Sequence, residues 1–283
     1  MVGKFIFLFL LGVLVVPVSS TAFADEEQDA VFKRVIETKT LRCGYWNWPP
    51  LYMVDPNTKE TTGIFKDLMA EFTRVTDIQV EWTQEIHFDN LISDLNNKKI
   101  DAVCAGAWLS GARAKFIRFS NPVFYTTMNA YKRADDPRFD GNRDSMNQPD
   151  ITIIGMDGEM SSEIAKADFP KAKLMSLPQI AGSATELLLN VDTGKGDITF
   201  ADAVGAGGFI KNNPGKIASV KMETPIRLMS NTIAVAGDEE RFQDFVNSVL
   251  QELHNSGVVE HILEKYDSAY PNVLVRVSKP YQE

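Results

Sequence analysis

Two groups of side chains in this sequence could recognise a small molecule. Tyr45, Trp46 and Trp48 directly follow a predicted strand, and rings in that position can stack on an apolar group or attract a cation. Arg113 lies three residues after Ser110, at the start of a predicted helix, where a guanidinium and free backbone amides would bind a carboxylate. A packed surface loop and a solvated charge are the simpler explanations of these two patterns.

The sequence offers little for catalysis or for a bound cofactor. Its histidines, His87, His254 and His261, are scattered, and no pair has the spacing of a metal site. Residues 205–208 are rich in glycine but lack the dinucleotide-binding pattern, so we attribute them to close helix packing. A Gly-x-Ser-x-Gly nucleophile motif is absent as well. We therefore expect a protein that is not an enzyme and that carries neither a metal nor a cofactor.

The two cysteines, Cys43 and Cys104, each lie in a predicted buried strand. Two alternatives remain for them: a pair of buried thiols, which we favour, or a disulfide between neighbouring strands. No activating base stands near either position in the sequence, so nucleophilic catalysis by a thiol is not expected.

Residues 1–24 have the composition of a secretory leader. Lys4 precedes an apolar run over residues 5–16, and Ala22 and Ala24 form a small-x-small cleavage site. That run is shorter than the about 20 apolar residues that span a bilayer, and no later segment is long and apolar enough. We expect cleavage after Ala24 and export of the mature chain. The formal charge of −9 disfavours a nucleic-acid partner, which would need a basic surface.

Short apolar runs alternate with amphipathic patterns through most of the remaining chain, which is typical of strand–helix–strand units around a largely parallel sheet. The first series predicts strands at 41–44, 78–82 and 101–105 and helices at 65–72 and 89–96. After a polar loop at 135–150, the second series predicts strands at 151–155, 197–201 and 233–236 and helices starting near 161 and 183, then at 242–250 and 258–266. Two such series predict an α/β fold with two lobes and a ligand cleft between them.

Residues 88–122 carry a dense run of motifs, and further motifs of the same pattern lie before and after this run. The run joins Phe88-Asp89-Asn90-Leu91, Ile100-Asp101-Ala102, Ser110-Gly111-Ala112-Arg113 and Phe119-Ser120-Asn121-Pro122, and further matches lie at 63–68, at 155 and at 196–202. In order and spacing they resemble the polar amino-acid type of periplasmic solute-binding proteins, family 3 of the bacterial extracellular solute-binding proteins. Those proteins are the extracytoplasmic receptors of ABC importers, so the resemblance implies a small-molecule ligand, an ABC permease as partner and a monomer.

The resemblance also implies the type II periplasmic-binding-protein fold, in which two parallel-sheet lobes are joined by two hinge strands. Here the hinge strands would run near 128–131 and 231–234. The first lobe would comprise 25–127 together with 232–283, and the second lobe 128–231. An amino acid or similar zwitterion would be enclosed between them.

The family's pattern assigns roles to individual residues of this chain. Arg113 would hold the ligand α-carboxylate with Ser110 and with backbone amides near Gly106 and Ser161, and Asp202 would hold the α-ammonium. The residues expected to cover the ligand side chain share an aromatic ring: Tyr45, Trp46, Trp48, Phe88 and Trp108. Opposed Arg–carboxylate and Asp–ammonium pairs read the two ends of a zwitterion, and closure of the lobes removes the water that would screen them.

The sequence departs from the family's pattern at three places. Trp108 replaces a usual Ser or Thr, Tyr45-Trp46 replaces an acidic residue, and residues 158–161 replace a Gly-Thr-Thr segment. The resulting ring-lined pocket favours an apolar, cyclic or methylated-cation side chain over an acidic one. A lyase on the same fold, with Glu159 or Asp157 as general acid, and a detached sensory subunit are the alternatives.

Overall fold

The computed structural model describes residues 28–87, 89–178, 184–270 and 273–278. The predicted leader, Phe88 and Ser183 lie outside these ranges. Within them, no helix is both long and apolar enough to cross a membrane. The described helices are α1 (Ala30–Thr38), α2 (Ile64–Thr76), α3 (Leu91–Asn96), α4 (Met160–Asp168), α5 (Ala184–Asp192), α6 (Ala203–Asn212), α7 (Glu240–Asn255) and α8 (Val258–Asp267).

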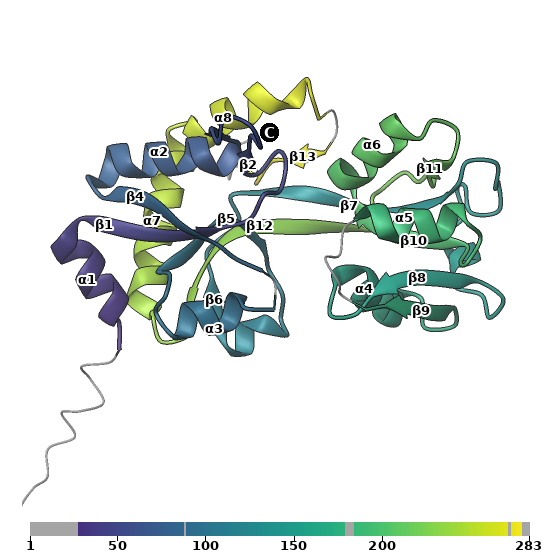
Figure 1. Cartoon of the computed structure of the whole chain (residues 1–283), viewed down its shortest axis with the longest axis horizontal. Helices are drawn as coiled ribbons and strands as arrows, with labels where there is room; N and C mark the ends of the chain where they lie inside the picture. Colours follow the sequence, from purple (N-terminus) through teal and green to yellow (C-terminus); the bar gives the residue numbers. More distant parts are fainter. Residues whose placement is uncertain (1–27, 88, 179–183, 271–272, 279–283) are drawn as a thin grey trace, which may run out of the picture.

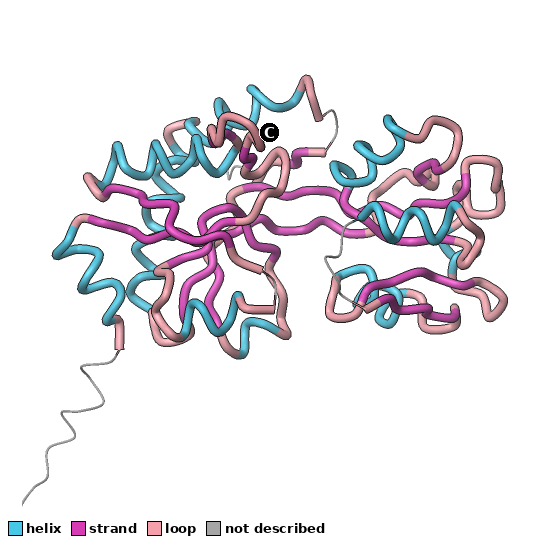
Figure 2. The backbone as a smooth tube through the Cα atoms, in the orientation of Figure 1, coloured by secondary structure: helices cyan, strands magenta, loops and turns pink. Residues whose placement is uncertain are grey.

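One continuous sheet runs through both halves of the molecule (Figures 1 and 2). Its main path is β4 (Gln79–Glu85), β1 (Thr40–Tyr45), β5 (Ala102–Trp108), β12 (Arg227–Ala236), β7 (Phe124–Arg133), β10 (Ile198–Asp202), β8 (Thr152–Met156) and β9 (Lys173–Leu177). The short strands are β2 (Met53–Val54), β3 (Thr61–Thr62), β6 (Ile117–Phe119), β11 (Ile217–Ser219) and β13 (Leu274–Val275). The three strands at each end of the path are parallel, whereas β12 and β7 pair antiparallel with each other and with their neighbours.

The expected two-lobed α/β fold is therefore confirmed. We call the half built on β4, β1 and β5 the first lobe and the half built on β10, β8 and β9 the second lobe. Helices α2, α7 and α8 pack with the first lobe, and α4, α5 and α6 with the second (Figure 1). The fully buried apolar residues form separate clusters in the two halves, so each lobe has its own core.

The two long strands β7 and β12 join the lobes. They pair with each other over residues 124–128 and 227–231, a few residues before each expected hinge segment. Residues 128–131 pair instead with β10, and residues 231–234 lie beside β5. Met128 stands at the junction, since it is opposite Arg227 on one side and opposite Asp202 on the other.

The amphipathic pattern at 65–72 forms α2, whose Phe65, Leu68, Met69 and Phe72 are all buried. This helix ends at Asp77, which has the left-handed conformation common at helix C-termini. The apolar run at 151–155 forms β8, buried on both faces as expected for a parallel strand flanked by neighbours.

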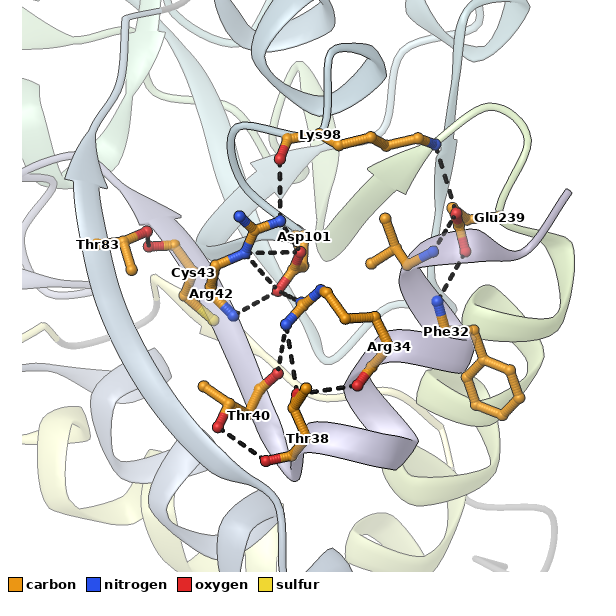
Figure 3. A network of polar contacts seen from close by, with 12 residues as sticks. Phe32, Arg34, Thr38, Thr40, Arg42, Cys43, Thr83, Lys98, Asp101 and Glu239 are labelled. Atoms are coloured by element: carbon orange, nitrogen blue, oxygen red, sulfur yellow. Dashed lines mark hydrogen bonds and ion pairs between the residues drawn. The ribbon is translucent and has the colours of Figure 1, made fainter. Parts of the chain in front are cut away.

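A charged network fixes the start of β5 beside β1 (Figure 3). The side chain of Asp101 is fully buried and accepts hydrogen bonds from the backbone N–H of Arg42 at 2.6 Å and from its Nη2 at 2.7 Å. Arg34 of α1 donates to the same carboxylate. Nearby, Glu239 accepts from the N–H groups of Val31 and Phe32 and so holds α1 against the start of α7.

The expectation of two free thiols is wrong. Cys43 of β1 and Cys104 of β5 form a disulfide, with their Cα atoms 5.4 Å apart and both residues fully buried. The two strands are parallel neighbours, which brings together cysteines separated by 61 positions in the sequence. The bond therefore ties together the two strands whose ends lead to Trp46 and Trp108.

The glycine-rich segment lies inside α6 and only partly fits the expected close packing. A Cβ on Gly205 would stand 2.9 Å from Oδ2 of Asp202 and 3.0 Å from the Cβ of Ala184. On Gly207 or Gly208 a Cβ would meet nothing within 4 Å. Close packing therefore accounts for the first of these glycines and not for the other two.

Candidate functional site

A cavity of about 970 Å³ lies where the two lobes face each other. The first lobe contributes Trp46, Asn47, Trp48, Pro49 and Trp108, and the second contributes Met156, Glu159, Met160, Ser161 and Asp202. Met128 of β7 also lines it, as do Tyr270 and Val273 from the segment after α8. Its size and its mostly apolar lining with a few polar groups are typical of small-molecule sites.

Three indoles form what we call the aromatic wall: Trp46, Trp48 and Trp108. The ring centroids of Trp46 and Trp48 are 6.4 Å apart. Those of Trp48 and Trp108 are 4.8 Å apart with their planes at 74°. Trp46 and Trp48 follow the end of β1, and Trp108 is the last residue of β5. The loop that carries Trp46 and Trp48 is fixed by a hydrogen bond of 2.8 Å from the N–H of Trp48 to the carbonyl of Tyr52.

The facing surface, which we call the acidic wall, comprises Met156, Glu159, Met160, Ser161 and Asp202. Most of it lies where β8 leads into α4, because Glu159 occupies the position just before the helix begins. The Oγ of buried Ser161 accepts a hydrogen bond from the N–H of Met156 at 3.1 Å. This bond fixes the turn that points Glu159 and Met160 toward the cavity.

Asp202 ends β10 and also caps α6. Its Oδ1 accepts a hydrogen bond from the N–H of Gly205 at 2.7 Å, as an N-terminal capping residue does. Burial raises the pKa of this carboxyl, and the backbone N–H groups of Gly205 and Val204 act in the opposite direction. The same side chain thus stabilises a helix and presents a carboxyl group to the cavity.

Glu159 is the second carboxyl group in the cavity. Burial raises its pKa, and the positive charge of Arg113 opposes that shift. The two side chains belong to different lobes, so the charge of Arg113 acts from the first lobe on a carboxyl group of the second. Lys211, which also lines the cavity, is exposed at the far end of α6.

The cavity brings together five of the residues that the sequence singled out: Trp46, Trp48, Trp108, Ser161 and Asp202. Tyr45, Gly106, Ser110 and Arg113 are not among its lining residues, and Phe88 lies outside the described part of the chain.

Local structure explains these placements. Tyr45 packs on the rings of Tyr52 and Trp82. Gly106 has a φ of +87°, and a Cβ there would stand 2.6 Å from the ring of Phe65, so this residue lies against the core of the first lobe. Arg113 opens a 3₁₀ turn of three residues instead of the predicted helix, and its N–H lies 3.5 Å from Oγ of Ser110.

Sequence reasoning missed several lining residues. Met128 and Tyr270 belong to no motif, and their positions depend on how the lobes meet. Glu159 was considered only as a possible general acid. The departure at 158–161 was the one signal that this segment carried something unusual. Within the described residues no group of three metal-ligating side chains comes together.

Comparisons with known proteins agree with this fold. The model of bacterial extracellular solute-binding proteins, family 3, matches residues 41–269. A probable histidine-binding protein of Neisseria gonorrhoeae is 24% identical over 72% of this chain and 74% of its own length. The membrane-bound lytic murein transglycosylase F of Pseudomonas fluorescens is 22% identical over 85% of this chain but only 48% of its own length.

Among solved structures, a mutant of ArgBP from T. maritima superposes with a TM-score of 0.64 at 25% identity. The match covers 84% of this chain and 99% of that one. Since the family model spans both lobes and the strands that join them, the chain belongs to family 3 of the bacterial extracellular solute-binding proteins.

Proposed function

We propose that this protein captures an amino acid or a similar small zwitterion between its lobes and delivers it to an ABC importer. The observation that carries the proposal is the cavity of about 970 Å³, which is lined by indoles of one lobe and by carboxyl groups of the other. Family membership and the relative named as histidine-binding support the same class of ligand.

In this proposal Asp202 binds the ligand ammonium while its other oxygen continues to cap α6. Arg113 binds the ligand carboxylate together with Ser110 and with backbone amides near Gly106 and Ser161. The aromatic wall covers the rest of the ligand. Two charge pairs that are buried when the lobes close are consistent with micromolar affinity, about −8 kcal/mol.

Export and delivery form the second part of the proposal. The leader is cleaved after Ala24, and the protein acts in the periplasm as a monomer that presents its ligand to a membrane permease. Residues 25–127 with 232–283 form one domain and residues 128–231 the other. The ligand is released unchanged, although the murein transglycosylase match shows that related domains also occur in enzymes.

Calorimetric titration of the exported protein with a panel of amino acids tests the proposal directly. We expect saturable binding of at least one zwitterion, with recovery of the unaltered ligand by mass spectrometry. Arg113→Ala should weaken binding by at least ten-fold, because a charge-assisted hydrogen bond contributes about 1.5–3 kcal/mol. Lys115→Ala, in the same 3₁₀ turn, is the matched control. Full affinity in the Arg113 variant would refute the carboxylate assignment, and chemical change of the ligand would show catalysis.

A further inference from the structure

Among the described residues, the acidic groups that line the cavity are more buried than its one lysine. Glu159 and Asp202 are partly buried carboxyl groups, whereas Lys211 is exposed and therefore screened by solvent. Both carboxyl groups line the cavity, and burial raises the pKa of each because it disfavours the charged form. A ligand that brings positive charge into the cavity would stabilise those charged forms.

The ligand carboxylate makes the imbalance larger. The positive charge of Arg113 already acts on Glu159. A carboxylate bound to Arg113 would place a second negative charge near Glu159, and like charges at short range repel. A ligand with an acidic side chain would add a third negative charge. A neutral side chain would leave the excess of negative charge unchanged, and a cationic side chain would remove it.

The aromatic wall selects among cations. Trp48 and Trp108 meet at 74°, and both line the cavity with Trp46. Indole is the best of the side-chain rings at attracting a cation, but a ring offers no acceptor for the N–H groups of a primary ammonium. An alkylated ammonium has few or no N–H groups that need an acceptor, and it is less strongly hydrated. It therefore loses less hydration free energy when it binds between the indole rings.

We propose that the ligand side chain carries an alkylated ammonium group that contacts Trp48 and Trp108, with Glu159 as its counter-charge. This inference rests on the proposed function and specifies the group at the far end of the ligand. Asp202 keeps its role at the α-ammonium. Glu159, where the family's usual pattern has a Gly-Thr-Thr segment, becomes the residue that sets the charge preference.

Titration calorimetry with three probes tests the proposal: Nε-trimethyl-L-lysine, L-lysine and the neutral L-norleucine. We expect trimethyl-lysine to bind about ten-fold more tightly than lysine, and lysine more tightly than norleucine. Lysine binding as tightly as trimethyl-lysine, or more tightly, would overturn the inference while leaving the proposed function intact. Failure of all three probes and of every other amino acid would instead overturn the proposed function.

Two variants test which side chains cause the preference for the cationic probes. Trp108→Phe keeps a ring with a weaker attraction for cations, so it should reduce the preference for trimethyl-lysine over norleucine about three-fold or more. Glu159→Gln should weaken both cationic probes about ten-fold relative to norleucine, because it removes the counter-charge. Glu163→Gln, an exposed position of the same helix, is the matched control. An unchanged ranking of the probes in Glu159→Gln would contradict the role of this carboxylate.

Discussion

The aromatic wall stands at the ends of β1 and β5, whereas the acidic wall is formed where β8 and β10 lead into α4 and α6. The first wall is tied by the disulfide between Cys43 and Cys104 and is stiffened by the contact between Trp48 and Trp108. The second depends on single hydrogen bonds, from Met156 to Ser161 and from Gly205 to Asp202. The aromatic wall is therefore fixed by a covalent bond, whereas the carboxyl groups of the acidic wall are positioned by the starts of two helices. We expect mutations to affect the two walls in different ways.

Removal of the disulfide should produce the largest effect on stability. For a loop of 61 residues, the chain-entropy account gives about 4 kcal/mol of lost free energy of unfolding in Cys43→Ala/Cys104→Ala. Urea unfolding followed by tryptophan fluorescence measures it. Wild-type protein in excess reductant should approach the same midpoint, and the double variant should not respond to reductant. Equal midpoints for the variant and the oxidised wild type would show that the bond is not what stabilises the aromatic wall.

At Asp202 the acidic wall allows helix capping and ligand binding to be separated. Asparagine caps helices about as well as aspartate, so Asp202→Asn should keep the stability that the cap contributes, while Asp202→Ala should lose about 1 kcal/mol of it. Both variants lose the charge, and both should bind a zwitterion at least ten-fold more weakly, because hydrogen bonds to charged groups contribute about 1.5–3 kcal/mol. Thermal denaturation and calorimetry on the same samples report the two effects. Undiminished affinity in Asp202→Asn would remove this residue from the ammonium site.

The pH dependence of stability should come from the acidic wall. Burial raises the folded-state pKa values of Glu159 and Asp202 above the ordinary 4.5 and 3.8. Around those pKa values the folded protein binds more protons than the unfolded chain, so both carboxyls make the free energy of unfolding fall as pH rises. Relative to wild type, Glu159→Gln/Asp202→Asn should therefore gain stability as pH is raised from roughly 4 to 7. Denaturant titrations at several pH values measure this, and parallel profiles would contradict it.

The smallest expected effect concerns the glycines of α6. Because a Cβ on Gly207 would meet no neighbour within 4 Å, Gly207→Ala should raise the free energy of unfolding by about 0.5–1 kcal/mol. At Gly205 the added methyl group would press on the capping carboxylate of Asp202, so Gly205→Ala should be destabilising. Thermal denaturation of the pair gives the comparison, and a shift of the same sign in both variants would contradict it.

The sequence predicted the elements that local pattern determines. The buried strands that became β1, β5, β8 and β10, and the amphipathic helices α2, α7 and α8, lie close to their expected positions. The elements that were missed include α1, β9 and β13, although α1 is amphipathic and buries Val31 and Val35. Strand β13 exists because it pairs with β7, and the sequence near residue 274 has no periodicity of its own.

Trp46 and Trp48 were predicted as cavity residues because they directly follow a buried strand. Trp108, Ser161 and Asp202 were predicted only through the resemblance to the family's pattern. The disulfide was the less favoured of two alternatives, because the pairing of strands whose cysteines are 61 positions apart cannot be read from spacing. Met128 and Tyr270 line the cavity through the meeting of distant segments, and no local motif records that contact.

Met128 has a mechanical consequence. It lines the cavity, it is opposite Asp202 in β10, and it is opposite Arg227 in the crossing pair of strands. A ligand held against Asp202 therefore acts within one strand spacing, about 5 Å, of the axis about which the lobes would turn. With so short a lever arm, a turn of the lobes about this axis would displace their outer surfaces much more than the residues beside the ligand.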